Sequence, residues 1–349
     1  MLSRWLARFG VALGAVVVLL IVAVAVVYAL SERRMQRTFS ITPRPLALPS
    51  DSASLARGAH LVQAVGMCVE CHGEKLDGQV MIDGPLGTVG APNLTRGTGG
   101  IGSLLTDADF VRAVRHGVAP DGRALMIMPA QDYMNFTDAD LAEVIAYVKS
   151  APPADNVVTD SKISLLGRTL LVTGKLPLYA AERIDHKAPS PAPVPAGPTK
   201  EYGAYVARIA CKGCHGPAYA GGPVASGDPS WPPASNLTVS GPTKQWNEAD
   251  FLRLMRTGRR PDSVPVNAAM PWKNAGRMTD DELHAVWSYL RSLPGRASGA
   301  TVQSASVSAS IAAVTDARAA VAHFTWLIAQ VQNMMSSADT SPDDNLESQ

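Results

Sequence analysis

The sequence predicts an all-α protein made of two tandem homologous domains, each of about 95 residues, a usual size for a small domain. One set of short motifs occurs twice in the same order, and the repeated segments carry apolar residues at helical spacing. An uncharged apolar run near the N-terminus predicts a transmembrane helix, and a heptad pattern near the C-terminus predicts an amphipathic helix.

The repeat is visible as matched motifs. The stretch CVECH at 68–72 corresponds to CKGCH at 211–215, and in each half Asn-Leu-Thr follows 25 positions after the first Cys. The stretch DADFVRAVRHG at 107–117 corresponds to EADFLRLMRTG at 248–258. A Met-Pro pair and a T-D-x-[DE]-L segment complete each copy. Self-similarity of this kind indicates a duplicated structural unit.

The repeated segments have the start and stop signals of helices. The stretches that follow Thr137 and Thr279 place their apolar residues on one face, and each Thr has an acidic residue three positions later. Shorter helices are expected to end at Gly117 and Gly258, because glycine readily adopts the left-handed conformation that closes a helix. Another helix should precede each Cys motif. No segment has a convincing strand pattern.

All four cysteines belong to the two C-x-x-C-H motifs. A thioredoxin-like motif normally needs one C-x-x-C and no following His, and a zinc ribbon places its two pairs about 15–20 residues apart. C-x-x-C-H is the attachment site of c-type haem, in which both thiols form thioethers and the His binds the iron. We predict two covalently bound haem c groups, with a zinc site or a redox disulfide as the alternatives. The predicted attachment and proximal residues are Cys68, Cys71 and His72, and Cys211, Cys214 and His215.

The Met-Pro pair supplies candidates for the second iron ligand. Met128 lies 56 positions after the proximal His of its half, and Met270 lies 55 positions after its own. Methionine usually fills core space, but the repeated position favours these two as distal ligands. Ligation by His and Met raises the reduction potential of a haem. Met134 and Met278 are the alternatives, although they do not align with each other. The other histidines do not repeat between the halves and are expected to be ordinary polar residues.

A proximal His usually donates its second N–H to a carbonyl, which fixes the ring. The residue before Asn-Leu-Thr is well placed to provide that carbonyl, and it is Pro92 in the first half and Ser235 in the second.

These motifs together resemble the class I c-type cytochromes, over residues 55–152 and 200–294. The resemblance implies the same proximal His, distal Met and carbonyl contacts. It also implies that a glycine of the first helix packs against an aromatic residue of the last, which Gly58 and Tyr147, and Gly203 and Tyr289, would satisfy. The whole chain resembles the membrane-bound cytochromes that serve bacterial periplasmic dehydrogenases, which commonly carry three haems where this chain has two motifs.

The N-terminal run of 20 uncharged residues at 11–30 is long enough to cross a bilayer core of about 30 Å. It exceeds the usual 7–15 residues of a signal-peptide core, so an anchor is favoured over a cleaved signal. Because c-type haem attachment in bacteria takes place outside the cytoplasmic membrane, we expect the inner membrane, with the haem domains in the periplasm.

The expected organisation follows from these motifs and from composition. The segments are an anchor (1–30), a tether (31–54), the first domain (55–152), a packed extension and Pro-rich linker (153–199), the second domain (200–294), an amphipathic helical tail (295–336) and a disordered acidic end (337–349). The tail should pack within the chain, with a coiled coil to a partner as the alternative.

The predicted function is electron transfer rather than catalysis. A net charge of +1 and the lack of a basic aromatic patch exclude a strong case for nucleic-acid binding. The expected partners are a dehydrogenase or other donor, an oxidase or other respiratory acceptor, and the membrane. A dihaem peroxidase is the enzymatic alternative and would need an open iron, whereas both halves contain a Met-Pro pair. A docking module, suggested by the heptad tail, is a third hypothesis.

Overall fold

The structure, a computed structural model, describes residues 2–224, 227 and 231–300. The expected acidic end and nearly all of the expected amphipathic tail, from residue 301 onward, lie outside these residues.

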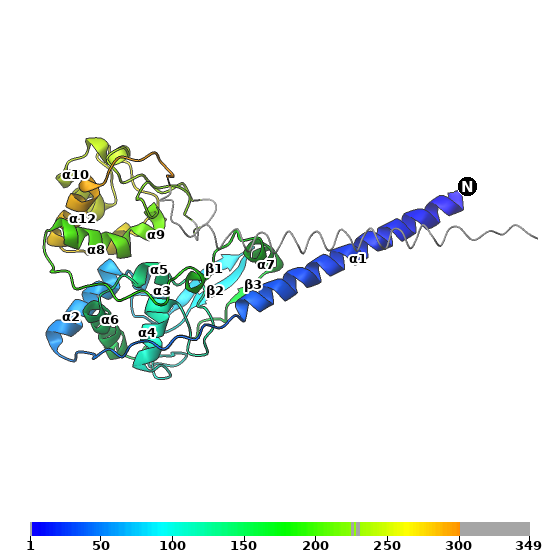
Figure 1. Cartoon of the computed structure of the whole chain (residues 1–349), viewed down its shortest axis with the longest axis horizontal. Helices are drawn as coiled ribbons and strands as arrows, with labels where there is room; N and C mark the ends of the chain where they lie inside the picture. Colours follow the sequence, from blue (N-terminus) through cyan, green and yellow to red (C-terminus); the bar gives the residue numbers. More distant parts are fainter. Residues whose placement is uncertain (1, 225–226, 228–230, 301–349) are drawn as a thin grey trace, which may run out of the picture. The chain divides into compact units, whose positions relative to one another are not determined.

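The first domain is built around a pair of packed helices at the two ends of its sequence. Helix α2 lies against α6, and Figure 1 shows the pair side by side. Thr137 caps α6 through its side chain, as expected, and the left-handed Gly117 (φ 64°) ends α4. The helical elements are α2 (Ser52–His60), a π-helical turn η1 (Leu61–Val65), α3 (Val69–His72), α4 (Asp107–His116), α5 (Ala130–Tyr133) and α6 (Asp138–Ser150).

The second domain repeats this plan. Helix α8 lies against α12, and Thr279 and Glu282 form a capping box at the start of α12. Gly258, with φ 66°, ends α10 in the way that Gly117 ends α4. The helical elements are α8 (Lys200–Ala210), α9 (Lys212–His215), η3 (Pro242–Gln245), α10 (Glu248–Thr257), α11 (Trp272–Ala275) and α12 (Asp280–Ser292).

A glycine lets the first and last helices of each domain approach closely. A Cβ on Gly58 would collide with the Glu143 carbonyl and with Tyr147 Cβ, as the resemblance implied. A Cβ on Gly203 would collide with the Ala285 carbonyl, at the position of the second repeat that corresponds to Glu143. The helices therefore meet backbone to backbone at this point in both domains.

The expectation that the fold has no strands was wrong. Strands β1 (Gln79–Gly84), β2 (Gly87–Ala91) and β3 (Lys162–Ile163) form an antiparallel sheet in that order. Strand β1 is largely exposed and its register shifts between Val80 and Ile82, so it lacks the clear alternation of a half-buried strand. The third strand is two residues long and comes from the extension, so the sheet depends on a contact between segments far apart in the chain.

The extension after the first domain packs on that domain, in keeping with its apolar composition. It contributes α7 (Leu165–Val172) and η2 (Ala180–Glu182), and its Leu171 and Tyr179 share a buried cluster with Val89 of β2. The N-terminal helix α1 (Leu2–Met35) also reaches this cluster through Met35. The helix thus continues beyond the expected anchor into the first residues of the expected tether.

Candidate haem sites

One helical turn gathers the three chemically active residues of each Cys motif. The His72 amide donates to the Cys68 carbonyl at 2.9 Å, and the His215 amide donates to the Cys211 carbonyl at 3.0 Å. Residues three and four positions apart lie on the same side of a helix, so each turn directs two thiols and one imidazole the same way. This is the placement that two thioethers and an axial imidazole require.

Each imidazole is oriented by a backbone carbonyl. His72 Nδ1 lies 2.9 Å from the Pro92 carbonyl oxygen, and His215 Nδ1 lies 2.8 Å from that of Ser235. The hydrogen bond assigns the proton to Nδ1, which leaves the Nε2 lone pair available to a metal. Burial lowers the pKa of both imidazoles, although the carbonyl contact opposes this effect, so the neutral form that binds metals is favoured.

Two glycines that the sequence analysis did not single out make these contacts possible. Gly78 and Gly221 have φ values of 79° and 71°, in the left-handed region. A Cβ on Gly78 would lie 2.5 Å from the Asn93 amide nitrogen, so a larger residue would push away the segment that holds His72. Each glycine follows its proximal His by six positions, and this shared spacing is the signal that could have identified them.

The Asn-Leu-Thr motif closes each haem loop onto the chain that follows the last helix. Asn93 Nδ2 donates to the Ala154 carbonyl at 2.7 Å, and Asn236 Nδ2 donates to the Arg296 carbonyl at 2.8 Å. The Asn93 side-chain oxygen accepts hydrogen bonds from the amide and the hydroxyl of Thr95, both at 2.8 Å. Both asparagines are buried, so the motif holds the carbonyl that orients the proximal His.

The two Met-Pro pairs adopt the same turn. Pro129 has φ −81° and ψ 54°, and Pro271 has φ −77° and ψ 52°, close to an inverse γ-turn. The residue after each proline donates its amide to the Met carbonyl, at 2.8 Å for Met128 and 2.7 Å for Met270. Each turn leads directly into a short helix, α5 or α11. The repeated geometry supports the prediction that Met128 and Met270 have the same role.

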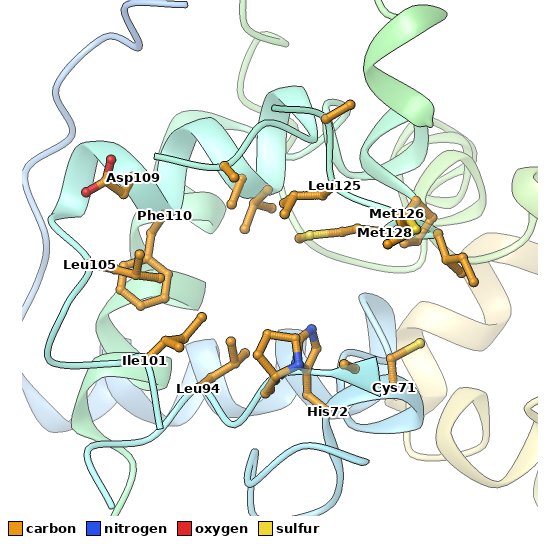
Figure 2. A pocket seen from close by; sticks show the side chains of 18 of the residues that line it. Cys71, His72, Leu94, Ile101, Leu105, Asp109, Phe110, Leu125, Met126 and Met128 are labelled. Atoms are coloured by element: carbon orange, nitrogen blue, oxygen red, sulfur yellow. Dashed lines mark hydrogen bonds between the residues drawn. The ribbon is translucent and has the colours of Figure 1, made fainter. Parts of the chain in front are cut away.

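In the first domain, Met128 and His72 face each other across a cavity of about 500 Å³. Figure 2 shows His72 and Cys71 on one side, and Leu125, Met126 and Met128 on the opposite side. The volume is within the range of cofactor pockets, roughly 300–1,000 Å³. Apolar residues that line the cavity include Leu94, Ile101, Leu105, Phe110, Leu125 and Ile145. The cavity fits haem c because an apolar slot lies between a free imidazole nitrogen and a thioether, with two thiols in its wall.

The alternative Met ligands lie elsewhere. Met134 packs against Ala130, Ala180 and Ile184 in a small separate cluster, and it is not among the residues that line the cavity. Met278 is 1% exposed and belongs to the main core. The structure therefore favours Met128 and Met270, whose role as ligands remains a prediction.

The structure also disfavours the alternative uses of the cysteines. Burial raises the pKa of the Cys68 and Cys211 thiols to about 12, whereas redox-active cysteines depend on a lowered pKa. Within residues 2–224, 227 and 231–300, no three Cys, His, Asp or Glu side chains are placed to hold a metal ion by themselves. A zinc site would need such a set.

Family models match both domains. The model described as cytochrome C oxidase, cbb3-type, subunit III matches residues 53–148, and the model described as cytochrome c matches residues 201–294. The chain belongs to the c-type cytochromes. Two cytochrome c domains imply haem c, in agreement with the two C-x-x-C-H motifs.

Similar proteins include cytochrome subunits of dehydrogenases. An alcohol dehydrogenase (quinone) cytochrome c subunit from Gluconacetobacter polyoxogenes is 30% identical over 70% of this chain and 57% of its own length. A gluconate 2-dehydrogenase cytochrome c subunit from Pantoea cypripedii is 30% identical over 73% of this chain and 64% of its own length. A diheme c-type cytochrome from Cereibacter sphaeroides is 26% identical over 68% of this chain and 86% of its own length.

The chain thus spans about six tenths of the length of the first two relatives. Their names describe cytochrome subunits and not catalytic subunits, which agrees with the prediction that this chain is not itself an enzyme.

Proposed function

We propose that the chain is a membrane-anchored dihaem cytochrome c that passes single electrons from a periplasmic dehydrogenase, or another donor, to a respiratory acceptor. When bound, haem c supplies a one-electron iron couple whose potential depends on its axial ligands and on burial. In each domain the paired Cys would hold the haem, and the proximal His and the Met would bind its iron. The apolar cavity wall of the first domain would keep water away from that iron.

The observation that carries this proposal is a reciprocal contact between the two haem-binding domains. Asn274 of α11 follows the Met270 turn, and its Nδ2 donates to Glu70 Oε1 at 2.5 Å. Glu70 lies between the two cysteines of the first domain. The distal-side turn of the second domain therefore touches the haem-attachment loop of the first.

The converse contact is made by the corresponding residues. Asp132 of α5 follows the Met128 turn, and its carboxylate lies against Gly213, between the two cysteines of the second domain. A Cβ placed on Gly213 would be 2.6 Å from Asp132 Oδ2. Asp132 and Asn274 hold equivalent positions in the two repeats, and so do Glu70 and Gly213. The two contacts therefore join equivalent positions of the two domains, so the interface is approximately twofold symmetric.

In each contact the residue that follows the Met-Pro turn is buried, whereas its partner in the attachment loop of the other domain, Glu70 or Gly213, is exposed. Asp132 and Asn274 are each 5% exposed. Burial raises the pKa of Asp132 to about 6, and the nearby charge of Lys212, in the attachment loop of the second domain, partly offsets that rise. Contact between the attachment loop of each domain and the turn that follows the Met-Pro pair of the other suits an electron relay, because the two haems would then lie in neighbouring parts of the two domains.

Two observations support the anchor and the donor. Within the described residues, the segment Arg4–Met35 is long and apolar enough to cross a membrane, with a mean hydropathy of 3.1 over its most apolar window. The named relatives are cytochrome subunits of dehydrogenases, which supports a dehydrogenase as the donor. We infer from these two observations a location at the bacterial inner membrane, with the haem domains in the periplasm.

A redox titration of the intact protein, combined with a peroxide assay, tests the proposed function. We expect two reversible one-electron steps, a low-spin iron in both sites and negligible peroxide reduction, because both sites have the same Met-Pro turn. Peroxide turnover at enzyme-like rates, roughly 1–10³ s⁻¹, or a high-spin iron at neutral pH, would instead support the peroxidase alternative.

A further inference from the structure

Helix α7 lies alongside the last turns of α1 (Figure 1). Arg168 Nη1 donates to Ser31 Oγ at 2.9 Å, and its guanidinium lies 4.7 Å from the centre of the Tyr28 ring. Three residues further along both helices, Arg34 Nη1 donates to the Leu171 carbonyl at 2.6 Å. The two helices therefore run in the same direction, so the start of α7 lies beside the earlier of these α1 residues and its end lies beside the later ones.

Ion pairs join the end of α1 to α7 and to η2. Arg34 contacts both carboxylate oxygens of Glu182, with Nη2 at 2.5 Å and Nε at 3.0 Å, and the Glu182 side chain is 15% exposed. Arg168 also pairs with Glu32 at 3.1 Å, and the Arg168 side chain is 14% exposed. The partly buried, bidentate Arg34–Glu182 pair holds a fixed geometry better than an exposed pair does. The end of α1 and helix α7 should move as one body.

The shared direction brings the first turn of α7 to the apolar part of α1. Both hydrogen-bonded pairs are separated by 137 positions, and the same separation matches Leu165 with Tyr28, where α1 becomes entirely uncharged. Leu165 is 40% exposed and Leu166 is 50% exposed. Gly167 behind them packs against the Leu86 carbonyl of the hairpin turn. The inner side of α7, which includes the buried Leu171, is thus occupied, whereas Leu165 and Leu166 are exposed at its first turn.

We propose that α7 is an interfacial helix whose first turn, Leu165 and Leu166, inserts into the lipid surface beside the span formed by α1. The inference rests on the proposed anchoring by α1. Lipid is the expected occupant because this apolar turn continues the surface of α1, whose most apolar window is entirely unburied. Tyr28 suits the boundary between hydrocarbon and headgroups.

The charges around this turn also suit a lipid surface. Exposed basic residues flank the two helices and would meet the phosphates of headgroups while their stems remain in the apolar layer. These residues are Arg33 near the end of α1 and Lys162 just before α7. Two parallel helices seated in the bilayer would fix the tilt of the first haem domain, whereas α1 alone would allow it to swing.

Cross-linking to lipid in a membrane tests the inference. The full chain is placed in phosphatidylcholine vesicles that contain a diazirine group in the acyl chain, illuminated, digested and mapped by mass spectrometry. We expect cross-links in α1 and in the first turn of α7. In the double variant Leu165→Glu and Leu166→Glu, the α7 cross-links should fall about tenfold while those of α1 persist, because a charged side chain resists entry into hydrocarbon.

The control is Leu104→Glu, at an apolar residue that is 75% exposed outside both helices. It should leave all cross-links unchanged, and the far-UV circular dichroism of each variant reports whether it has folded. Cross-links in α1 but not in wild-type α7 would overturn the interfacial helix and leave the anchor in place. Cross-links in α7 but not in α1 would overturn the anchor and, with it, the insertion of α7 beside a span. In native membranes, capture of a protein by α7 instead of lipid would also overturn the inference.

Discussion

Replacement of Met128 by Ala is expected to lower the reduction potential of one haem and to leave the other nearly unchanged. The reason is the loss of a thioether ligand, since a His/Met pair raises the potential of a haem iron. We expect a shift on the order of 0.1–0.3 V, a fraction of the range of about 0.8 V that axial ligands span. Separate redox titrations of the wild type and the variant measure this shift.

Met270→Ala should have the same effect on the other haem, because its turn has the same backbone geometry. Met134→Ala is the matched control, since Met134 packs in a separate small cluster. Its titration curve should match that of the wild type. If Met128→Ala and Met270→Ala both left the spectrum and the potentials unchanged, the assignment of the distal ligands would be wrong.

Replacement of Glu282 by Ala is expected to destabilise the contact between the two haem domains and to slow electron exchange between the haems. Glu282 is 2% exposed. Its carboxylate lies 2.7 Å from His60 Nε2 and 3.4 Å from Arg57 Nη1, and both of these residues are on α2 of the first domain. It also accepts a hydrogen bond from the Tyr202 hydroxyl at 3.2 Å. Removal of one partner from a buried charge network typically costs about 3–5 kcal/mol.

Chemical denaturation measures the loss of unfolding free energy. Photoreduction followed by absorbance measures the rate of electron exchange between the haems. The matched control is Glu248→Ala, which removes a second Glu–His pair of the same length, 2.7 Å, whose side chains are 44% and 39% exposed. That exposed pair should contribute at most about 1 kcal/mol to the free energy of unfolding. Equal losses of stability in the two variants, with unchanged electron exchange in Glu282→Ala, would contradict the role of the buried network.

The effect of Glu282→Ala should also depend on pH. Burial raises the pKa of this carboxyl, but the His60 contact, the Thr279 amide and the Arg57 charge together bring it below its ordinary value of 4.5. A lowered pKa contributes stability above the unfolded value, and that contribution is lost as the pH falls through the folded value. The difference in unfolding free energy between the wild type and the variant should therefore shrink below about pH 4.5.

Local signals made much of the fold predictable. The caps of α6 and α12 and the glycines that end α4 and α10 act within a few residues, so the sequence shows them directly. The sheet was missed because its third strand pairs residues 162–163 with residues 87–88, far away in the chain. A pairing of this kind depends on tertiary contact more than on local pattern.

The same distinction between local and long-range signals applies to the candidate sites. The spacing of the two copies identified the residues that the structure places around the first cavity, because a repeat preserves position. The sequence contains no comparable spacing signal for the contacts between the two domains. His60 meets Glu282 across 222 positions, and Asp132 meets Gly213 through packing alone. Asp132 and Asn274 hold equivalent positions but differ in residue type, and so do Gly213 and Glu70, so a match of residue types between the two halves does not reveal these contacts.

The intact mass of the denatured protein tests the central claim most directly. Thioether bonds survive denaturation, so protein made in cells with working haem-attachment machinery should have the mass of the polypeptide plus two haems. The double variant Cys211→Ser and Cys214→Ser should have the mass of the polypeptide plus one, because only Cys68 and Cys71 remain to hold a haem. An unmodified polypeptide mass for the wild-type protein from such cells would contradict the account.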